Sequence, residues 1–377
     1  MSKHSSWVQI IIFTAFIALF FVLNLFMPDR AHSEQENRDL AQAPKFSFSS
    51  LFEGSFTKKY ETYTTDQFVF RDGWTTLKAG TELALGKKEN KGVYLCTDGS
   101  LIEEYVTPEK QQLDVNIAAV KSLSESAGVP VYFALIPGAA DIRSDVLPKN
   151  APNDSQKATI DYCYKNSGAI NIDMYSALAP HANEYIFYNT DHHWTSLGAY
   201  YGFGAIASAM NVPYPALDSY DRKTVSNDFY GTVYSKSGFS WVKPDSIEIF
   251  AEQNEATQVF NYPKDDPVKS SLYALDFLDK KDKYSMFMGG ITPLIKVETA
   301  KAEAPSLLII RDSYTDSLVP LLQNDFSEIH VMDLRYYKSK LFNSTVADYI
   351  AENNIDEVLV CYSMFNFGTD TNVFLMG

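Results

Sequence analysis

The chain has 377 residues, of which 46% are hydrophobic and 21% are charged, enough apolar side chains for one large core or two ordinary ones. This composition excludes a disordered chain, a collagen-like repeat and a multi-span membrane protein. Acidic residues outnumber basic residues by 47 to 32, and the net charge of −15 repels phosphate backbones, so we expect no nucleic acid partner. Three cysteines without a C-x-x-C pair exclude a disulfide framework and argue against a zinc knuckle.

The N-terminus contains a stretch that predicts a membrane-spanning helix. Residues 7–27 are apolar except for three polar side chains, and they would form about 30 Å of helix. Lys3 precedes this stretch and an acidic-polar segment follows it, so the positive-inside rule places residues 1–6 in the cytoplasm. We expect an uncleaved signal-anchor. A cleaved signal peptide is the alternative, but Pro44 directly follows the nearest A-x-A triplet and disfavours cleavage there.

The remainder of the chain is then predicted to be extracytoplasmic, on a single-pass membrane protein. Lys3 is the only charged residue up to position 27, so the exported part has 31 basic against 47 acidic residues and a net charge of −16. Residues 28–56 lack sustained periodicity and are predicted to form a stalk. Residues 57–377 are predicted to form the folded domain.

The first part of that domain has helical and hairpin patterns. Apolar and aromatic residues at helical spacing over 57–85 predict one or two helices, with a break at Gly73. Asp98-Gly99 between two short apolar runs predicts a hairpin. Thr107-Pro108-Glu109 then predicts the start of a helix that runs to about Ala127.

Short apolar runs then alternate with helical patterns. Strands are predicted at 131–136, 169–173, 185–188, 307–310, 329–332 and 357–361, and helices at 155–166, 174–182, 195–210, 315–324 and 341–353. This alternation predicts an α/β fold, a three-layer sandwich with a mainly parallel sheet. The poorly periodic segment 213–304 is predicted to be an insertion or lid.

Two loops of this predicted sheet contain side chains that could act together in catalysis. Residues 189–194 follow the predicted strand 185–188, and residues 311–314 follow the strand 307–310. Reactive groups collect at the carboxyl ends of parallel strands. We therefore expect Ser313 as nucleophile, His193 as its base and Asp191 as the group that orients the base, brought together from two adjacent strand ends. The first N–H groups of the helix after Ser313 would stabilise an oxyanion.

Each of these residues has a simpler interpretation. Ser313 could be only a helix N-cap, and Trp194 could be only a packed wall. His192 would point away from His193 in an extended segment and is predicted to be structural. Two histidines after Asp191 could ligate a metal, but no third or fourth His or Cys stands nearby, so no metal is predicted. The sequence also has no glycine-rich nucleotide loop, so no cofactor is predicted.

Three motifs in order carry a resemblance to a known family. They are the run 191–194 (DHHW) with Thr195 and Gly198, the run 311–314 (RDSY) with Pro320, and the run 333–336 (DLRY). Together they resemble the exported DHHW-motif proteins, relatives of the alginate O-acetylation proteins within the SGNH hydrolase superfamily. Residues 36–40, 66–72 and 92–94 are also similar to the opening of that family, so the resemblance covers nearly the whole exported chain.

The resemblance implies an SGNH-hydrolase-like fold whose catalytic triad is Ser313, His193 and Asp191. His193 precedes Ser313, the permuted order of the alginate-acetylation branch, and Arg311 stands where the superfamily usually has glycine. Further residues are implied as possible oxyanion or substrate-binding groups: Tyr314, Gly289, Gly290, Trp194 and Asn366.

The implied activity is that of a serine-dependent O-acetyltransferase or acetylesterase acting on a cell-surface polysaccharide. A membrane-bound O-acyltransferase is the implied acetyl donor. Two alternatives remain open: a catalytically inactive glycan-binding or scaffold protein, and a metal-dependent hydrolase that uses His192 and His193. The acidic charge suits a neutral or cationic glycan better than a strongly anionic one.

Overall fold

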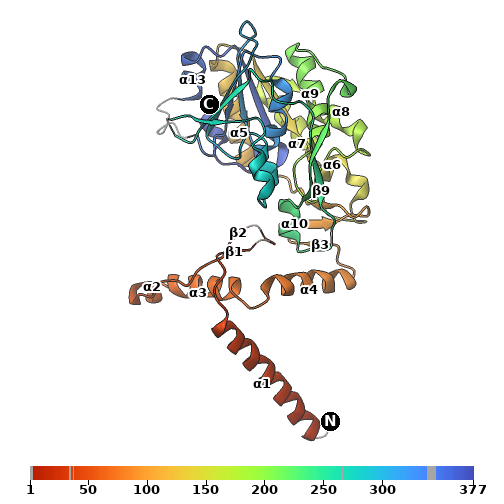
Figure 1. Cartoon of the computed structure of the whole chain (residues 1–377), viewed down its shortest axis with the longest axis vertical. Helices are drawn as coiled ribbons and strands as arrows, with labels where there is room; N and C mark the ends of the chain where they lie inside the picture. Colours follow the sequence, from red (N-terminus) through yellow and green to blue (C-terminus); the bar gives the residue numbers. More distant parts are fainter. Residues whose placement is uncertain (1–2, 34, 37, 265, 338–344) are drawn as a thin grey trace. The chain divides into compact units, whose positions relative to one another are not determined.

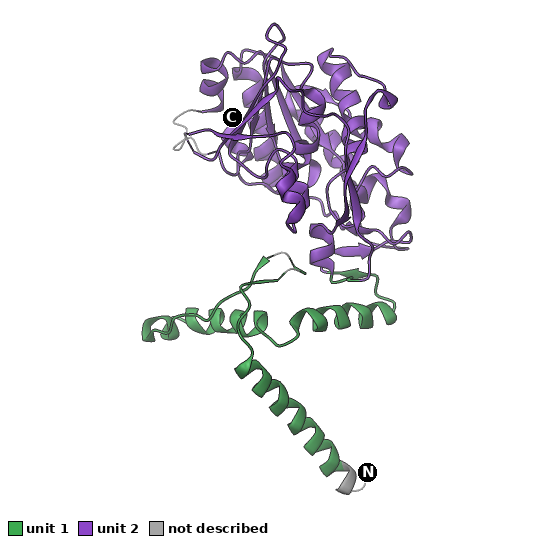
Figure 2. Ribbon diagram, in the orientation of Figure 1, with its two compact units in different colours: residues 1–90, 238–240 green, residues 91–237, 241–377 purple. Residues whose placement is uncertain are grey.

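The computed structural model describes residues 3–33, 35–36, 38–264, 266–337 and 345–377. The chain divides into two compact units, and Figure 2 colours them separately: residues 1–90 with 238–240, and residues 91–237 with 241–377. Residues 341–344, where the last predicted helix was expected to begin, lie outside the described residues.

The first unit is mainly helical. Helix α1 spans Lys3–Phe26, and its segment Ser6–Phe26 is long and apolar enough to cross a membrane, a property that a signal sequence shares. The other elements are β1 (His32–Ser33), β2 (Arg38–Asp39), α2 (Phe48–Phe52), α3 (Ser55–Asp66), α4 (Arg71–Ala84) and β3 (Glu89–Asn90) (Figure 1).

The break between the two helices predicted for 57–85 lies earlier in the chain than expected. It falls between α3 and α4, where Phe70 has a positive φ of 57°, and the prediction of a break at Gly73 was wrong. Gly73 lies in the first turn of α4. The N–H groups there have no partner within the helix in any case, so a glycine does not end it.

The second unit is built on an eight-stranded mixed sheet with the order β11-β10-β12-β14-β13-β15-β6-β7. The five strands β7 (Ile170–Ile172), β6 (Val131–Ile136), β15 (Glu357–Ser363), β13 (Leu307–Arg311) and β14 (Glu328–Met332) run parallel. The strands β12 (Leu294–Glu298), β10 (Gln258–Tyr262) and β11 (Val268–Ser270) continue the sheet antiparallel. The predicted α/β fold with a mainly parallel sheet is confirmed.

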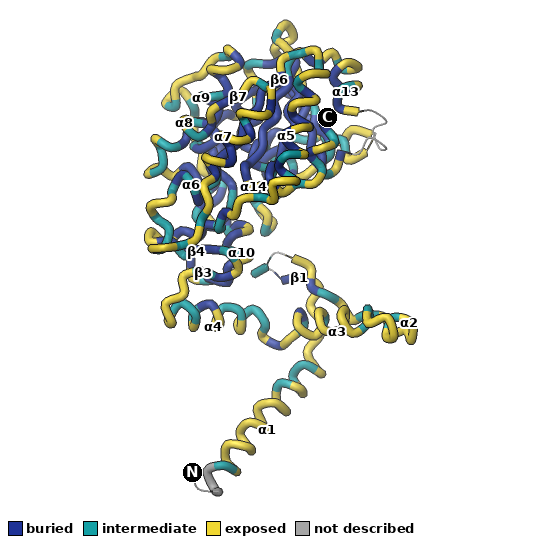
Figure 3. The backbone as a smooth tube through the Cα atoms, turned by 180° about the vertical axis from the view of Figure 1, so that it is seen from behind, coloured by how far each residue is buried: buried dark blue, intermediate teal, exposed yellow. Residues whose placement is uncertain are grey.

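Helices cover both faces of this sheet because its strands bury side chains on both sides. Along β6, for example, all six residues are buried, and alternate ones belong to different apolar clusters. One cluster includes α8 (Met174–Leu178), α9 (Ser196–Met210) and α11 (Val319–Leu322). The other includes α5 (Lys110–Ser126), α7 (Gln156–Ser167), α13 (Val346–Glu352) and α14 (Met364–Thr369). Figure 3 shows these strands as a continuous buried layer.

Segment 213–304 contributes to the sheet as well as to the surface around the site. Its strands β10, β11 and β12 form one edge of the sheet. Its strands β8 (Lys223–Phe229) and β9 (Asp245–Ile249) pair with each other, and α10 (Thr232–Ser237) lies between them in the chain. A third apolar cluster joins this segment to Tyr188, next to the DHHW motif.

The predicted strand at 185–188 is wrong. These residues form no strand of the sheet, and only an isolated bridge links Phe187 to Trp194. The segment is apolar because Ile186, Phe187 and Tyr188 are buried under a turn that folds back on itself. Continuous burial therefore produced the same sequence signal as a buried strand.

Candidate active site

A tight turn presents the DHHW motif at the end of the buried segment 186–188. Tyr188 N donates to His193 O at 3.2 Å, and Thr195 N donates to Ile186 O at 2.9 Å. Thr195 then caps α9, since its hydroxyl accepts from Gly198 N at 3.3 Å. A Cβ on Gly198 would lie 2.9 Å from the Trp194 Cβ, so the close approach of helix and turn requires glycine there.

Asp191 is buried at the tip of this turn with both carboxylate oxygens engaged. Oδ1 accepts from His193 N at 3.0 Å and lies 2.5 Å from His193 Nδ1. Oδ2 accepts from the backbone N–H of Thr232 at 2.7 Å and from its hydroxyl at 3.0 Å. Burial by itself would raise the pKa of Asp191, but the two neighbouring histidines and these hydrogen bonds outweigh it and hold the pKa well below its ordinary value.

The other nitrogen of His193 faces the predicted nucleophile. His193 Nε2 lies 2.9 Å from Ser313 Oγ, so Asp191, His193 and Ser313 form one chain of hydrogen bonds. Burial and the neighbouring His192 lower the pKa of His193, against the opposing effect of Asp191. The lowered pKa favours the neutral imidazole, which is the form that can accept a proton.

Tyr284 fixes the plane of this imidazole. Its ring stacks on His193 with a centroid separation of 3.8 Å and an interplanar angle of 10°. Its hydroxyl donates to Ser313 O at 3.2 Å, which ties the base to the segment that carries the nucleophile. Tyr284 belongs to segment 213–304, so that segment supplies both Thr232 and Tyr284 to the site.

Ser313 follows β13, where the chain enters a five-residue 3-10 helix, Ser313–Ser317. The N–H groups expected to stabilise an oxyanion are partly occupied there. Asp312 Oδ1 accepts from Tyr314 N at 3.1 Å, and Asp312 O accepts from Thr315 N at 3.2 Å. Asp312 Oδ2 accepts from Ser363 and, at 2.8 Å, from Asn366 Nδ2, so Asp312 links the serine turn to the end of β15.

Arg311, the first residue of the RDSY motif, is part of the core. Its side chain is fully buried, with ion pairs of 3.0 Å to Asp316 and 3.3 Å to Asp333. Asp333 also pairs with Arg335 at 2.6 Å. The RDSY and DLRY motifs are therefore joined by a buried ionic network.

The structure places the remaining candidate residues in two different surroundings. Trp194 and Tyr314 are buried beside the triad. Trp194 Nε1 donates to Tyr314 O at 2.8 Å, and the Tyr314 hydroxyl donates to His192 O. Gly289 and Gly290 have positive φ values of 80° and 86°. Their closest neighbours belong to segment 213–304, as in an ordinary turn, and include no triad residue.

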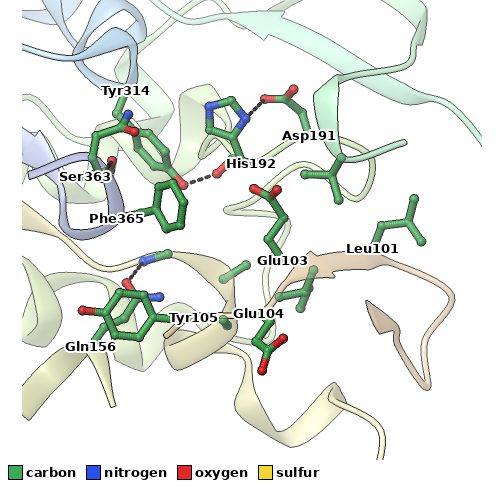
Figure 4. A pocket seen from close by; sticks show the side chains of 16 residues that line it. Leu101, Glu103, Glu104, Tyr105, Gln156, Asp191, His192, Tyr314, Ser363 and Phe365 are labelled. Carbon is green, nitrogen blue, oxygen red and sulfur yellow. Dashed lines mark hydrogen bonds and ion pairs between the residues drawn. The ribbon is translucent and has the colours of Figure 1, made fainter. Parts of the chain in front are cut away.

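A small pocket with a cavity volume of about 60 Å³ lies at the carboxyl ends of β6 and β15, next to β13. Figure 4 shows Glu103, Tyr314, Ser363 and Phe365 around it, with Asp191 and His192 at one side. Gln156 and Asn366 also line it. Its position beside the turn that carries Ser313 is where an open α/β sheet is expected to bind a ligand.

Asp191, His192 and His193 are close enough to be considered as metal ligands, since their ligand atoms lie within 4.8 Å of one another. Each already has a partner. His193 lies between Asp191 and Ser313, and His192 Nδ1 lies 2.6 Å from the Thr232 hydroxyl. A metal would have to displace these bonds, so the residues fit a hydrogen-bonded triad better than a metal centre.

Sequence reasoning missed several residues that hold the site. Thr232, Tyr284 and Asp245 come from the poorly periodic middle segment, where no local pattern marked them. Asp245 accepts from Asn189 N and Thr190 N, both at 2.8 Å, and so fixes the turn before the motif. Asp312 did have a signal, because it directly precedes Ser313 and aspartate is a favoured N-cap residue.

Comparison with known proteins identifies the family. The model of the DHHW protein family matches residues 85–332. The chain belongs to the DHHW protein family. Among solved structures, this DHHW protein is similar to a DHHW family protein from Eubacterium siraeum, with 26% identity and a TM-score of 0.65 over 76% of the chain and 95% of the other. It is also similar in fold to Bacillus cereus PatB1, with 20% identity and a TM-score of 0.62 over 75% and 97% of the two chains.

Curated relatives of this DHHW protein include two proteins described as probable alginate O-acetylase AlgJ. It is 24% identical to the protein from Pseudomonas putida over 43% of the chain, and 27% identical to that from Pseudomonas aeruginosa over 42%. The chain spans less than half the length of these relatives, 45% and 44%. The similarity supports the predicted relationship to the alginate O-acetylation proteins.

Proposed function

We propose that this DHHW protein is a serine-dependent acyltransferase that moves acetyl groups onto or off a polysaccharide. The observation that carries the proposal is the continuous chain from Asp191 through His193 to Ser313, with distances of 2.5 and 2.9 Å. A serine hydroxyl gains nucleophilicity only when a base removes its proton and a third group orients that base. The similarity to proteins described as probable alginate O-acetylases supports acetyl as the transferred group.

The reaction proceeds in two halves. In the first, Ser313 Oγ attacks the acetyl carbonyl of the donor while His193 Nε2 takes the serine proton and then gives it to the leaving oxygen of the donor. In the second, His193 removes the proton from an incoming hydroxyl, whose oxygen attacks the acetyl-serine. The ester bond to Ser313 breaks, and His193 returns the proton to Ser313. A sugar hydroxyl as the acceptor gives transfer, and water gives hydrolysis.

The negative charge that develops on the acetyl oxygen needs hydrogen-bond donors. Ser313 N–H, at the first position of its 3-10 helix, is one candidate. Asn366 is the second, because its amide nitrogen carries two hydrogens and the bond to Asp312 at 2.8 Å uses only one. Asn366 lines the pocket, so its second hydrogen is available to a bound ester.

The proposed location is the outer face of a membrane, with α1 as anchor and a membrane-bound O-acyltransferase as the acetyl donor. The apolar helix Ser6–Phe26 supports this placement. Retention of α1 is tested by the N-terminal sequence of the mature protein purified from membranes. A mature chain that begins after residue 27 would favour secretion after cleavage.

Replacement of Ser313 tests the activity. Ser313→Ala should abolish hydrolysis of an acetyl ester and covalent labelling by a sulfonyl reagent, while Ser126→Ala, an exposed serine on α5, should leave both unchanged. Unchanged turnover in Ser313→Ala would refute the triad. Retention of a glycan with neither labelling nor turnover would instead favour the alternative of a binding protein. Transfer is distinguished from hydrolysis by adding an oligosaccharide and measuring its mass by mass spectrometry. An added acetyl group indicates transfer, and an unchanged oligosaccharide with released acetate indicates hydrolysis.

A further inference from the structure

Helix α4 exposes the face that carries its largest apolar side chains. At about 100° per residue, Trp74 and Leu77 lie about 60° apart around the helix axis, and Phe70 and Leu85 flank the helix at its two ends. Their exposed fractions are 63%, 38%, 57% and 83%. The opposite face carries Ala79, which is fully buried. A helix of a globular domain normally turns its apolar stripe to the core, so α4 is arranged for a second apolar environment.

Exposed apolar residues are also present on and around α2. No residue of α2 is buried, and Phe48 and Phe52 are exposed by 72% and 87%. The rings of Phe46 and Phe48 lie 5.3 Å apart, and Phe46 also contacts Phe56 of α3 at 5.3 Å. We call the exposed set the aromatic platform: Phe46, Phe48, Leu51, Phe52, Tyr60, Phe70, Trp74, Leu77 and Leu85.

The charge of this region differs from that of the remainder of the chain. Residues 45–88 have seven basic and five acidic side chains, a net charge of +2, whereas the other residues have 25 basic and 42 acidic, a net charge of −17. Lys78 lies on the same side of α4 as Trp74 and is 64% exposed, and it pairs only loosely with Glu82 at 3.8 Å. Basic and aromatic side chains together are typical of helices that lie at an anionic membrane surface.

Contacts between α1 and the start of α4 indicate the depth at which α4 would lie relative to a bilayer. Phe20 packs against Phe68 and Trp74, with ring centroids 6.0 and 5.6 Å apart. Asn24 Oδ1 accepts from Val69 N at 2.8 Å. Both α1 residues lie within two turns of Phe26, where the apolar span ends. When α1 crosses a membrane, the start of α4 must therefore lie near the boundary between headgroups and acyl chains.

We propose that the aromatic platform binds the lipid surface, in the interface of the extracytoplasmic leaflet. The apolar side chains enter the acyl boundary and the lysines remain among the headgroups. The platform is then a second membrane contact in addition to α1. This contact restricts the motion of the segment that leads into the second unit, residues 91–237 and 241–377.

Depth-sensitive labelling of the full chain in vesicles tests this proposal. The three native cysteines are buried, so a single introduced cysteine can be labelled selectively. Leu77→Cys and Leu85→Cys place a polarity-sensitive dye on the platform. Val115→Cys, at an exposed apolar residue of α5 with 44% exposure, is the matched control. The vesicles contain phosphatidylglycerol and phosphatidylcholine, with bromine-labelled lipid as quencher.

We expect the dye at positions 77 and 85 to shift to shorter wavelengths and to be quenched by bromine near the headgroups, while the dye at 115 stays unquenched. A platform dye that remains in water in pure lipid vesicles would overturn the proposal and indicate a protein partner. Energy transfer between platform dyes on different chains, without lipid quenching, would overturn it in favour of a second copy. Equal quenching at position 115 would also overturn it, because the contact would then be non-specific.

Discussion

Gly231 is the position at which one added methyl group should disable the triad. Gly231 lies directly before Thr232, whose backbone N–H and hydroxyl hold Asp191. A Cβ at Gly231 would come within 2.6 Å of Asp191 Cγ and closer still to its Cβ and Oδ2. Ordinary contact begins at 3.4 Å, so Gly231→Ala forces the Asp191 carboxyl group to move by at least about 0.8 Å, the shift that Cγ alone requires.

The consequence for catalysis follows from the short bond that Asp191 makes. A shift of this size breaks or lengthens the 2.5 Å contact with His193 Nδ1 and frees the imidazole to rotate away from Ser313. A misplacement of about 1 Å costs about 100-fold in rate, and loss of the carboxylate's role costs about 10⁴-fold. We expect the decrease in kcat/KM of Gly231→Ala to lie between these two fold-losses. This corresponds to a loss of about 3–5 kcal/mol in transition-state stabilisation.

Acetyl-ester hydrolysis by the purified full chain measures this effect. Thermal unfolding should be recorded on the same sample, so that lost folding is distinguished from lost activity. Gly73→Ala is the control, because nothing lies within 4 Å of a Cβ there and the residue is in a helix. A folded Gly231→Ala protein with wild-type kcat/KM would refute the argument that Asp191 acts through His193 in this geometry.

Three further predictions concern the base, its stacking partner and the buried ion pairs. Because the pKa of His193 is lowered and its neutral form is the base, kcat/KM should rise with pH through an inflection below 6.5; an inflection above 6.5 in the pH profile would contradict this. Tyr284→Ala should lower kcat by about 10–100-fold, whereas Tyr284→Phe, which keeps the ring on His193, should stay within a few fold; equal losses in both variants would rule out a stacking role. Arg311→Met should reduce the free energy of unfolding, measured in urea, by about 3–5 kcal/mol because Asp316 loses its buried partner. Arg222→Met, which removes a surface ion pair, should change it by less than about 1 kcal/mol. Similar values for the two variants would contradict a stabilising role of the buried network.

The layers of the fold were predictable because its parallel strands are buried on both faces. Residues 131–136 and 307–310 are continuous apolar runs closed by polar or turn residues, and that pattern gave β6 and β13 directly. The same pattern misassigned residues 185–188, where burial comes from a folded-back turn and not from sheet pairing. The antiparallel strands β10–β12 were not predicted, since edge strands are half exposed and their pairing partners are distant in sequence.

For the site, sequence reasoning reached the residues whose chemistry is local and missed those that act from a distance. Asp191, His193 and Ser313 lie in short polar motifs that break apolar runs, so each stood out. Thr232 and Tyr284 are ordinary residue types in an aperiodic segment, and only the folded chain shows them against Asp191 and His193. The oxyanion donors were only partly predictable. Asp312 accepts hydrogen bonds from the N–H groups of Tyr314 and Thr315, and the motif alone does not reveal that these two donors are occupied.

The hydrogen bond between Trp194 and the serine turn has a consequence for how the chain folds. Trp194 Nε1 donates to Tyr314 O at 2.8 Å across 120 residues of sequence, and this contact docks the histidine turn on the serine turn. Contacts between residues so far apart in sequence tend to form slowly. We therefore expect the proposed base to meet its nucleophile late in folding. The Trp194 indole is fully buried in the folded chain, so its fluorescence should report the docking of the two turns.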